Sequence, residues 1–533
     1  MIGFHIDFNV HHFRRDYLER WLTDLARLGY DTILWELEDA VAWDTCPECA
    51  PPDAYTKDEF RELLALSRRL GLEPIPLLQT IGHCEYVLRH SPYSHLAETP
   101  DRVDQYCPRN PQLVPFLRNW IDEYLDLFGD VRYFHIGADE AWQLGECPDC
   151  KAYAERHSLS QLYIDHVNAV CAGLIERGVR PCVWADMILH HHEALDRLSR
   201  KVVLFDWMYD IYRGNGKVCV WGQGLQRTEE LSPETLATFG ESLFPDGDEP
   251  AREPETFYTA DYLAARGFDV VTCPSSASGA DSVFAPRHWL HMINTYDSVR
   301  KGQADHLHGS LLTSWTIRIP PWELQRAVIE LAAHIASHPH QPIEQFERAY
   351  VKRHLGADRP EFWRACGLLA KPGLFNDVRT LGFGKNAIPV PKDHVQQSLT
   401  GLAAEGRIEH ELATVQDRLA EYRRGLDLFR ALAEPSDKGG PILETWSLAA
   451  RNLVNRAEIT AFLLTHAATP GSAAPLAPAV RQRGAELLAQ MRKLRADTHA
   501  LYSSILKPTR LKLVIEWLYG SVEHALTHAL QGH

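Results

Sequence analysis

The chain has 533 residues, of which 45% are hydrophobic and 24% charged, and its formal net charge is −16. This length allows two or three domains with buried cores. The acidic balance argues against nucleic acids and anionic membranes as partners, because both attract clusters of Lys and Arg.

Neither the N-terminal stretch nor the cysteines indicate an exported protein. The first residues show no basic leader followed by an apolar segment, so we expect no signal peptide. No run of about 18 apolar residues indicates a membrane span. The eleven cysteines are an odd number, and several of them (Cys171, Cys182 and Cys366) lie in helix-like or strand-like segments. This pattern favours reduced thiols over a disulfide framework and predicts a cytoplasmic location.

Strand-like and helix-like segments alternate through the first part of the chain. Eight short apolar runs predict buried strands: Ile2–Phe8, Thr32–Leu37, Pro74–Leu78, Val131–Ile136, Pro181–Trp184, Val202–Trp207, Val270–Cys273 and Leu307–Trp315. Amphipathic segments predict eight helices between and after them: Phe13–Leu28, Lys57–Leu70, Leu113–Phe128, Leu159–Arg177, His192–Leu198, Ala260–Arg266, His288–Arg300 and Trp322–Ser337. Eight such pairs predict an α/β fold, a (β/α)8 TIM barrel over residues 1–338.

Beyond the predicted barrel the strand signal disappears. Long helical patterns cover Arg407–Leu432, Ile442–His466, Val480–Leu506 and Lys512–Leu530, separated by clusters of Pro and Gly. We therefore expect a mostly α-helical C-terminal domain over residues 339–533.

Polar and aromatic side chains gather at the predicted C-terminal ends of the strands, where TIM barrels place their active sites. Acids and tryptophans together suit a sugar, since carboxylates bind hydroxyls and indole rings stack on the sugar face. The candidates for substrate binding are Asp7, Glu38, Trp184, Trp207, Tyr209, Asp210 and Trp315.

One motif gives these candidates a family context. His135-Ile-Gly-Ala-Asp139-Glu140 resembles the His-x-Gly-Gly-Asp-Glu signature of family 20 glycoside hydrolases, the β-N-acetylhexosaminidases. Further similarities follow in barrel order, among them Trp35-Glu-Leu-Glu-Asp39, Pro76-Leu-Leu-Gln-Thr-Ile-Gly-His83 and the tryptophans at 184 and 315. The resemblance covers about residues 1–338. Because the sequence starts directly with predicted strand one, we expect a form of the family without the small α/β domain that commonly precedes the barrel.

The resemblance implies an exo-acting enzyme that removes terminal GlcNAc or GalNAc by a retaining, substrate-assisted mechanism. The 2-acetamido oxygen of the substrate would attack its own anomeric carbon and form an oxazoline. Glu140 would act as general acid and then base, Asp139 would orient the acetamido group, and His83 with Asp39 would form a relay that orients Glu140. No cofactor takes part in this chemistry.

The chain departs from the family pattern at two places. The strand-one arginine that holds the outer hydroxyls of the sugar is absent, because the chain reads Asp7-Phe-Asn-Val10. The Tyr-x-Asp at the end of strand seven is also missing. We expect Tyr209 and Asp210 to replace that tyrosine and acid.

Two C-x-x-C pairs, Cys46/Cys49 and Cys147/Cys150, follow predicted strands two and four. Four thiolates suit a tetrahedral structural zinc, which would join two loops at the rim of the pocket. A disulfide or four unlinked thiols are the alternatives.

Other functions stay open on the sequence alone. They are a β-N-acetylgalactosaminidase of another acetamido-assisted barrel family, a metal-dependent TIM-barrel hydrolase, and a non-catalytic sugar-binding protein. The expected partner is a small carbohydrate with a terminal N-acetylhexosamine, and a homodimer is not excluded.

Overall fold

The structure, a computed structural model, describes residues 1–209, 216–221, 223–245, 253–383, 390–433, 439–466 and 476–531. Its first part is a closed barrel of eight parallel strands: β1 (Ile2–Asp7), β2 (Thr32–Glu36), β3 (Glu73–Leu77), β4 (Tyr133–His135), β5 (Arg180–Trp184), β6 (Val203–Trp207), β9 (Asp269–Cys273) and β11 (Gly309–Ser314). The strands pair in this order, and β1 closes the ring against β11, with Ile2 opposite Ser310. The predicted TIM barrel is confirmed.

The strands read as apolar runs because both of their faces are buried, as in other parallel sheets. The barrel interior is filled by a cluster that includes Leu34, Leu77, Phe205 and Leu311. The opposite faces of the strands pack on the surrounding helices. This packed interior leaves the C-terminal ends of the strands as the place for a pocket.

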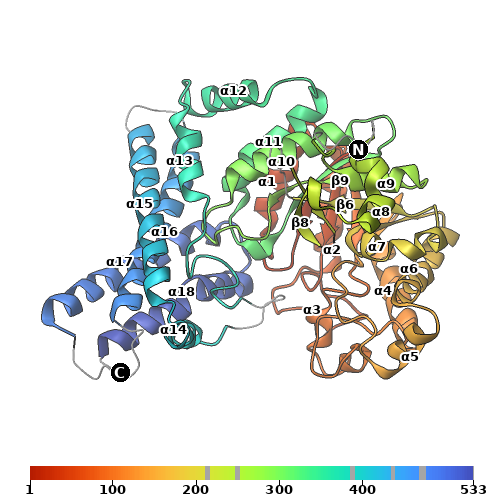
Figure 1. The fold of residues 1–533 in the computed structure, drawn as a ribbon, viewed down its shortest axis with the longest axis horizontal. Helices are drawn as coiled ribbons and strands as arrows, with labels where there is room; N and C mark the ends of the chain where they lie inside the picture. Colours follow the sequence, from red (N-terminus) through yellow and green to blue (C-terminus); the bar gives the residue numbers. More distant parts are fainter. Residues whose placement is uncertain are drawn as a thin grey trace.

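Helices surround the barrel (Figure 1). The principal ones are α1 (Arg15–Leu28), α2 (Lys57–Arg69), α4 (Leu113–Phe128), α6 (Leu159–Glu176), α9 (Tyr258–Ala265), α10 (His288–Gly302) and α11 (Trp322–Ser337). The helix predicted after strand five is instead a short α7 (Asp186–His190) followed by a 3-10 turn at His192–Arg197. The segment between β6 and α9 carries the hairpin β7 (Lys217–Val220) and β8 (Gly224–Arg227) and helix α8 (Pro233–Leu243), which sequence patterns did not predict.

Every element that the structure describes after β11 is a helix, as expected. The long ones are α15 (Ile408–Ala433), α16 (Gly440–His466), α17 (Pro478–Ser503) and α18 (Pro508–Gln531), which lie together beside the barrel in Figure 1. Three shorter helices, α12 (Ile343–Leu355), α13 (Glu361–Leu369) and α14 (His394–Ala404), were not predicted.

The helical region is joined to the barrel by specific polar contacts. The Tyr502 hydroxyl donates to the Ile319 carbonyl at 2.9 Å, and the Arg14 N–H donates to the Ile505 carbonyl at 2.7 Å. Arg510 binds both oxygens of Asp39 at 2.6 and 2.8 Å. Asp39 lies just beyond β2, so the last helix reaches toward the pocket end of the barrel. Within the described ranges, no helix combines the length and apolarity that a membrane crossing requires.

Candidate active site

The pair Asp139 and Glu140 lies on the turn that follows β4. Gly137 has φ +63°, a conformation that favours glycine. Gly82 approaches this turn so closely that a Cβ there would lie 2.1 Å from the Asp139 carbonyl oxygen. Only glycine leaves room for the two loops to meet, so the loop after β3 is held against the acids.

His83, which this second loop carries, contacts both acids. Its Nε2 lies 3.0 Å from Asp139 Oδ2 and 3.4 Å from Glu140 Oε2. The Asp139 side chain is 5% exposed, whereas that of Glu140 is 33% exposed. The two acids therefore differ in depth: Asp139 lies inside the site and Glu140 at its opening.

Asp186, at the start of α7, fixes the position of Glu140 through the backbone. Its Oδ2 accepts the Glu140 N–H at 3.0 Å. Burial raises the pKa of Asp186 well above its ordinary value, and the nearby Asp139 adds to this effect. Asp186 is thus a buried acid behind the turn; it follows predicted strand five but was not among the predicted site residues.

A cavity of about 300 Å³ opens at this end of the barrel, at the small end of the range for ligand pockets. Its lining brings together many of the predicted residues: Asp7, Glu38, His83, Asp139, Glu140, Trp207, Tyr209 and Trp315. Such a volume fits one monosaccharide unit better than an extended chain.

Aromatic side chains form one wall of the cavity. Trp207 and Tyr209 are stacked, with ring centroids 5.3 Å apart. The Trp315 Nε1 donates to the Tyr209 hydroxyl at 2.7 Å, and this hydroxyl lies 3.3 Å from Thr313 Oγ1. These bonds hold the rings in place at the wall of the cavity, and aromatic rings pack well on the apolar face of a sugar.

Further acids lie deeper, around the ends of β1 and β2. The pKa of Asp7 is raised to about 6, first by burial and then by Glu36. The pKa of Glu38 is raised well above its ordinary value by burial and by Glu36, although Asn9 Nδ2 donates to it at 2.9 Å. Protonated acids of this kind can donate hydrogen bonds as well as accept them.

Two predicted residues that the structure describes, Asp39 and Trp184, do not line the cavity. Asp39 does not join His83: its carboxylate is bound by Arg510, by His12 Nε2 at 3.0 Å and by Arg89 at 3.1 Å. The predicted relay through Asp39 is therefore wrong, because Arg510, Arg89 and His12 engage this acid instead. Trp184 is fully buried in the barrel interior behind Trp315, with ring centroids 5.7 Å apart. Asp210 lies outside the described residues.

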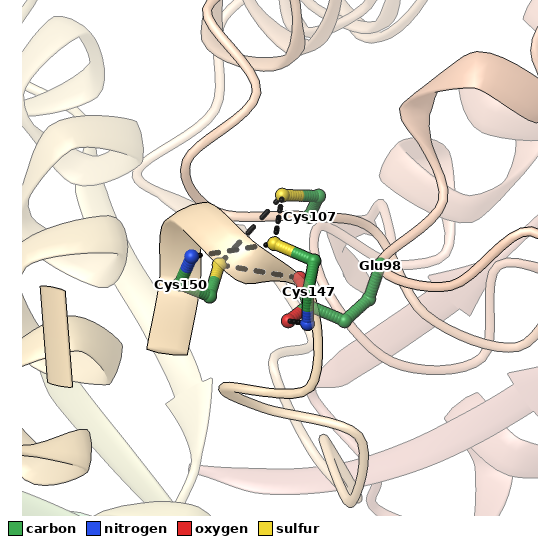
Figure 2. A group of neighbouring side chains, drawn as sticks. All are labelled: Glu98, Cys107, Cys147 and Cys150. Carbon is green, nitrogen blue, oxygen red and sulfur yellow. Dashed lines mark hydrogen bonds between the residues drawn. The ribbon is translucent and has the colours of Figure 1, made fainter. Parts of the chain in front are cut away.

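The predicted zinc site of four cysteines is also wrong, because the two C-x-x-C pairs do not come together. Cys46 and Cys49 are joined to each other in a disulfide. Cys147 and Cys150 instead lie beside Cys107 and Glu98 (Figure 2). The C-x-x-C spacing found the two pairs, but it gave no information on which loops come together in space.

Seven residues of the lining were not among the predicted site residues: Asn9, Glu36, Gln79, Gly279, Ile317, Arg318 and Arg379. Gln79 Nε2 donates to Glu36 Oε1 at 2.8 Å at the base of the site. Arg318 follows β11, and Arg379 comes from the segment between α13 and α14, so the helical region contributes to the pocket. No sequence motif marks Arg379, because it reaches the cavity only through the docking of that region.

Comparison with known proteins agrees with this geometry. Residues 3–218 match the family described as glycosyl hydrolase family 20, catalytic domain. Hexosaminidase D of Homo sapiens is 32% identical over 177 residues, which are 32% of this chain and 36% of the relative. Hexosaminidase D of Bos taurus is 30% identical over 177 residues, which are 32% of this chain and 51% of the relative.

The chain thus matches between a third and a half of the length of these curated relatives. A crystal structure of the family 20 exo-β-N-acetylglucosaminidase from Vibrio harveyi is similar at 18% identity with a TM-score of 0.46, covering 64% of this chain and 55% of that one. Residues 3–218 contain β1 to β6 and the Asp139–Glu140 pair. This part of the chain is thus similar to the catalytic domain of glycosyl hydrolase family 20.

Proposed function

We propose that this protein is an exo-acting β-N-acetylhexosaminidase, which removes a terminal GlcNAc or GalNAc by the substrate-assisted route. The observation that carries the proposal is the pair of adjacent acids, both in contact with His83, at the edge of a cavity with an aromatic wall. The names of the curated relatives and the matched family support the same activity.

The different depths of the two acids suggest their roles. Glu140, at the opening, is placed where a leaving group departs, and it would protonate the glycosidic oxygen and then activate water. Asp139, the deeper acid, would accept a hydrogen bond from the acetamido N–H. A negative charge at this point stabilises the positive charge that develops as the acetamido oxygen attacks the anomeric carbon.

His83 and Asp186 are positioning residues in this proposal. A His83 N–H that lies between the two carboxylates would reduce their mutual repulsion. The hydrogen bond from the Glu140 N–H to Asp186 fixes the backbone of the general acid. A small displacement of that backbone would separate the acid from the leaving oxygen.

Arg318 and Arg379 are our candidates for holding the outer hydroxyls of the sugar. Both line the cavity, and the β1 arginine of the family is absent here. Arg318 Nε is buried and has no hydrogen-bond partner among the described residues. Such a buried donor gains most from a bound hydroxyl, since burying it without one costs about 1–3 kcal/mol.

Selectivity between GlcNAc and GalNAc depends on how these side chains meet the 4-hydroxyl, so the proposal covers both sugars. The structure gives less support to a metal-dependent hydrolase. The acids of the cavity share its lining with Asn9, Gln79 and aromatic rings, and among the described residues they do not form a group with the spacing of metal ligands. The one cluster of ligand type found in the described chain contains Cys107, Cys147, Cys150 and Glu98, none of which lines the cavity.

A panel of nitrophenyl β-glycosides tests the proposal. GlcNAc and GalNAc would be compared with glucose and galactose on the same leaving group. We expect hydrolysis of at least one 2-acetamido sugar and loss of more than about 10³-fold in kcat/KM without the acetamido group, since an intramolecular nucleophile of high effective molarity is removed. Equal rates on glucose and GlcNAc would contradict the proposal, and binding without any hydrolysis would leave a sugar-binding protein.

A further inference from the structure

Three cysteines and one glutamate, none of which lines the cavity, form a compact cluster (Figure 2). The ligand atoms of Glu98, Cys107, Cys147 and Cys150 all lie within 4.8 Å of one another. Glu98, Cys107 and Cys150 are buried, and Cys147 is half-buried. None of the three sulfurs belongs to a disulfide.

The spacing of these atoms is that of a tetrahedral metal site. Cys107 Sγ lies 3.5 Å from Cys147 Sγ and 3.7 Å from Cys150 Sγ. Cys150 Sγ lies 3.3 Å from Glu98 Oε2. Zinc with Zn–S bonds of about 2.3 Å and a Zn–O bond of about 2.0 Å separates tetrahedral ligands by about 3.8 Å between sulfurs and about 3.5 Å between sulfur and oxygen. The observed distances require little movement to close around an ion.

The charge of Glu98 provides a second, independent argument. This buried carboxylate accepts from the Cys147 N–H at 3.0 Å and from the Cys150 thiol. No Lys, Arg or His forms an ion pair with it in the ranges that the structure describes. A buried carboxylate without a countercharge is costly, and a divalent cation among the three sulfurs would supply that charge.

The backbone presents the ligands from two loops. Glu98 and Cys107 flank a short antiparallel bridge between Ala97 and Tyr106, in which the Cys107 N–H donates to the Leu96 carbonyl at 2.8 Å. Cys147 caps α5 (Pro148–Arg156), and the Cys150 N–H donates to its Sγ at 3.3 Å. An N–H donor at a helix N-terminus stabilises thiolate charge.

We propose that Glu98, Cys107, Cys147 and Cys150 hold one zinc ion in a closed structural site. Three thiolates and a carboxylate suit this borderline-soft ion, and four protein ligands leave no open position for catalysis. Cys147 lies seven residues after Glu140. The ion would therefore fix the loop of the catalytic pair to the loop that precedes α4 (Leu113–Phe128).

The proposal does not depend on the enzymatic activity, and its test is made on metal content. Protein produced with zinc in the medium should contain about one zinc per chain. Cys107→Ser and Cys150→Ser should each weaken zinc binding by at least about 100-fold, since even loss of a second-shell partner costs up to that much. Cys171→Ser, which alters a buried free cysteine outside the cluster, is the matched control and should keep its zinc.

Two further measurements keep the test valid if a cysteine variant does not fold. Glu98→Gln keeps the side-chain size, and cobalt bound to this variant should still show thiolate-to-metal charge-transfer absorption, with weaker affinity. In the wild type, a chelator should release the ion, expose three more thiols to alkylation and increase hydrogen exchange in residues 136–147.

Three results would overturn the proposal. The first is wild-type protein without metal, and the second is equal zinc content in Cys107→Ser and the wild type. The third is a disulfide that joins Cys147 to Cys107 or to Cys150 in protein isolated without a reductant, which would make the cluster a redox pair.

Discussion

At the residue scale, backbone strain is concentrated at the pocket. Glu38, His83, Ala138 and Glu140 have φ values of 43°, 55°, 71° and 47°, in the left-handed region that side chains rarely adopt. Each such residue costs on the order of 1–3 kcal/mol. Half of the eight non-glycine residues of this kind in the described chain lie at the C-terminal ends of β2, β3 and β4. The surrounding fold holds the acids in positions that the local chain would not choose.

Removal of the general acid should affect substrates unequally. Glu140→Gln keeps the shape of the side chain but cannot donate a proton to the leaving oxygen. General acid catalysis is typically worth about 10² to 10⁴-fold, so kcat/KM for an alkyl or sugar leaving group should fall by at least about 100-fold. A nitrophenolate leaving group needs little protonation and should lose less.

The control for this prediction is Glu146→Gln, an exposed acid on the same loop, which should retain activity. Equal losses for Glu140→Gln on both classes of substrate would argue that Glu140 does not act as the acid.

Arg379 should contribute to substrate binding more than to the chemical step. Arg379 lines the cavity from outside the barrel. Arg379→Ala should therefore raise KM by about 10-fold or more, which corresponds to one or two lost hydrogen bonds. The change in kcat should be smaller. Arg364→Ala removes an exposed arginine of α13 and should leave both constants unchanged. A loss confined to kcat would place Arg379 in the chemistry instead.

At the scale of elements, the ion pair between Asp39 and Arg510 joins α18 to the end of β2. Burial alone would raise the pKa of Asp39, but Arg510 and His12 outweigh it and hold that pKa well below its ordinary value. Asp39 and Arg510 are both nearly inaccessible to solvent, with side chains 2% and 4% exposed. A buried pair of this kind is sensitive to the loss of one member, since the other charge stays buried.

Arg510→Ala should therefore destabilise the protein by about 3–5 kcal/mol. The free energy of unfolding in urea measures this loss. Arg495→Ala removes an arginine that binds Glu523 and Glu516 on the surface of the helical region, and should cost about 1 kcal/mol or less. If both variants lose the same amount, the docking of α18 does not depend on the buried pair.

Asp206 at the end of β6 predicts a dependence of stability on pH. Burial raises the pKa of this acid to about 7, while Thr259 Oγ1 donates to it at 2.7 Å and partly offsets that effect. The folded state therefore holds a proton that the unfolded chain releases near pH 4. This contribution to stability is complete below about pH 4 and is lost as pH rises toward 7, at up to about 1.4 kcal/mol per pH unit.

Asp206→Asn removes this dependence. Relative to the wild type, the variant should gain stability between pH 4 and pH 7, with a constant difference above that window, as measured by thermal unfolding at each pH. Asp196→Asn, whose side chain is 95% exposed, should follow the wild type at every pH. A difference between Asp206→Asn and the wild type that stays constant from pH 4 to pH 7 would contradict the raised pKa.

At the scale of the whole molecule, local patterns predicted the barrel well, because each buried parallel strand appears as an apolar run and each outer helix has an apolar face. The same patterns placed Asp139, Glu140, His83, Trp207, Tyr209 and Trp315 at one end of the barrel, and the structure gathers them around one cavity.

Contacts between distant segments could not be predicted from such patterns. Asp39 was assigned to the site because it follows a strand, but its partner Arg510 lies 471 residues away. Arg379 reaches the cavity only through the docking of the helical region, and Cys107 joins Cys147 only through the meeting of two loops. A property of one segment does not reveal which other segment will pack against it.

The central claim is that the acetamido oxygen of the substrate is the nucleophile, assisted by Asp139 and Glu140. Nitrophenyl glycosides whose N-acetyl group carries none, one, two or three fluorine atoms test it most directly. Each fluorine withdraws electron density from the amide oxygen while the leaving group stays the same. If that oxygen attacks, kcat/KM should fall steeply with every added fluorine, because the transition state loses the stabilising nucleophile. A nearly constant kcat/KM across the series would contradict the account and indicate that a carboxylate of the protein attacks the sugar.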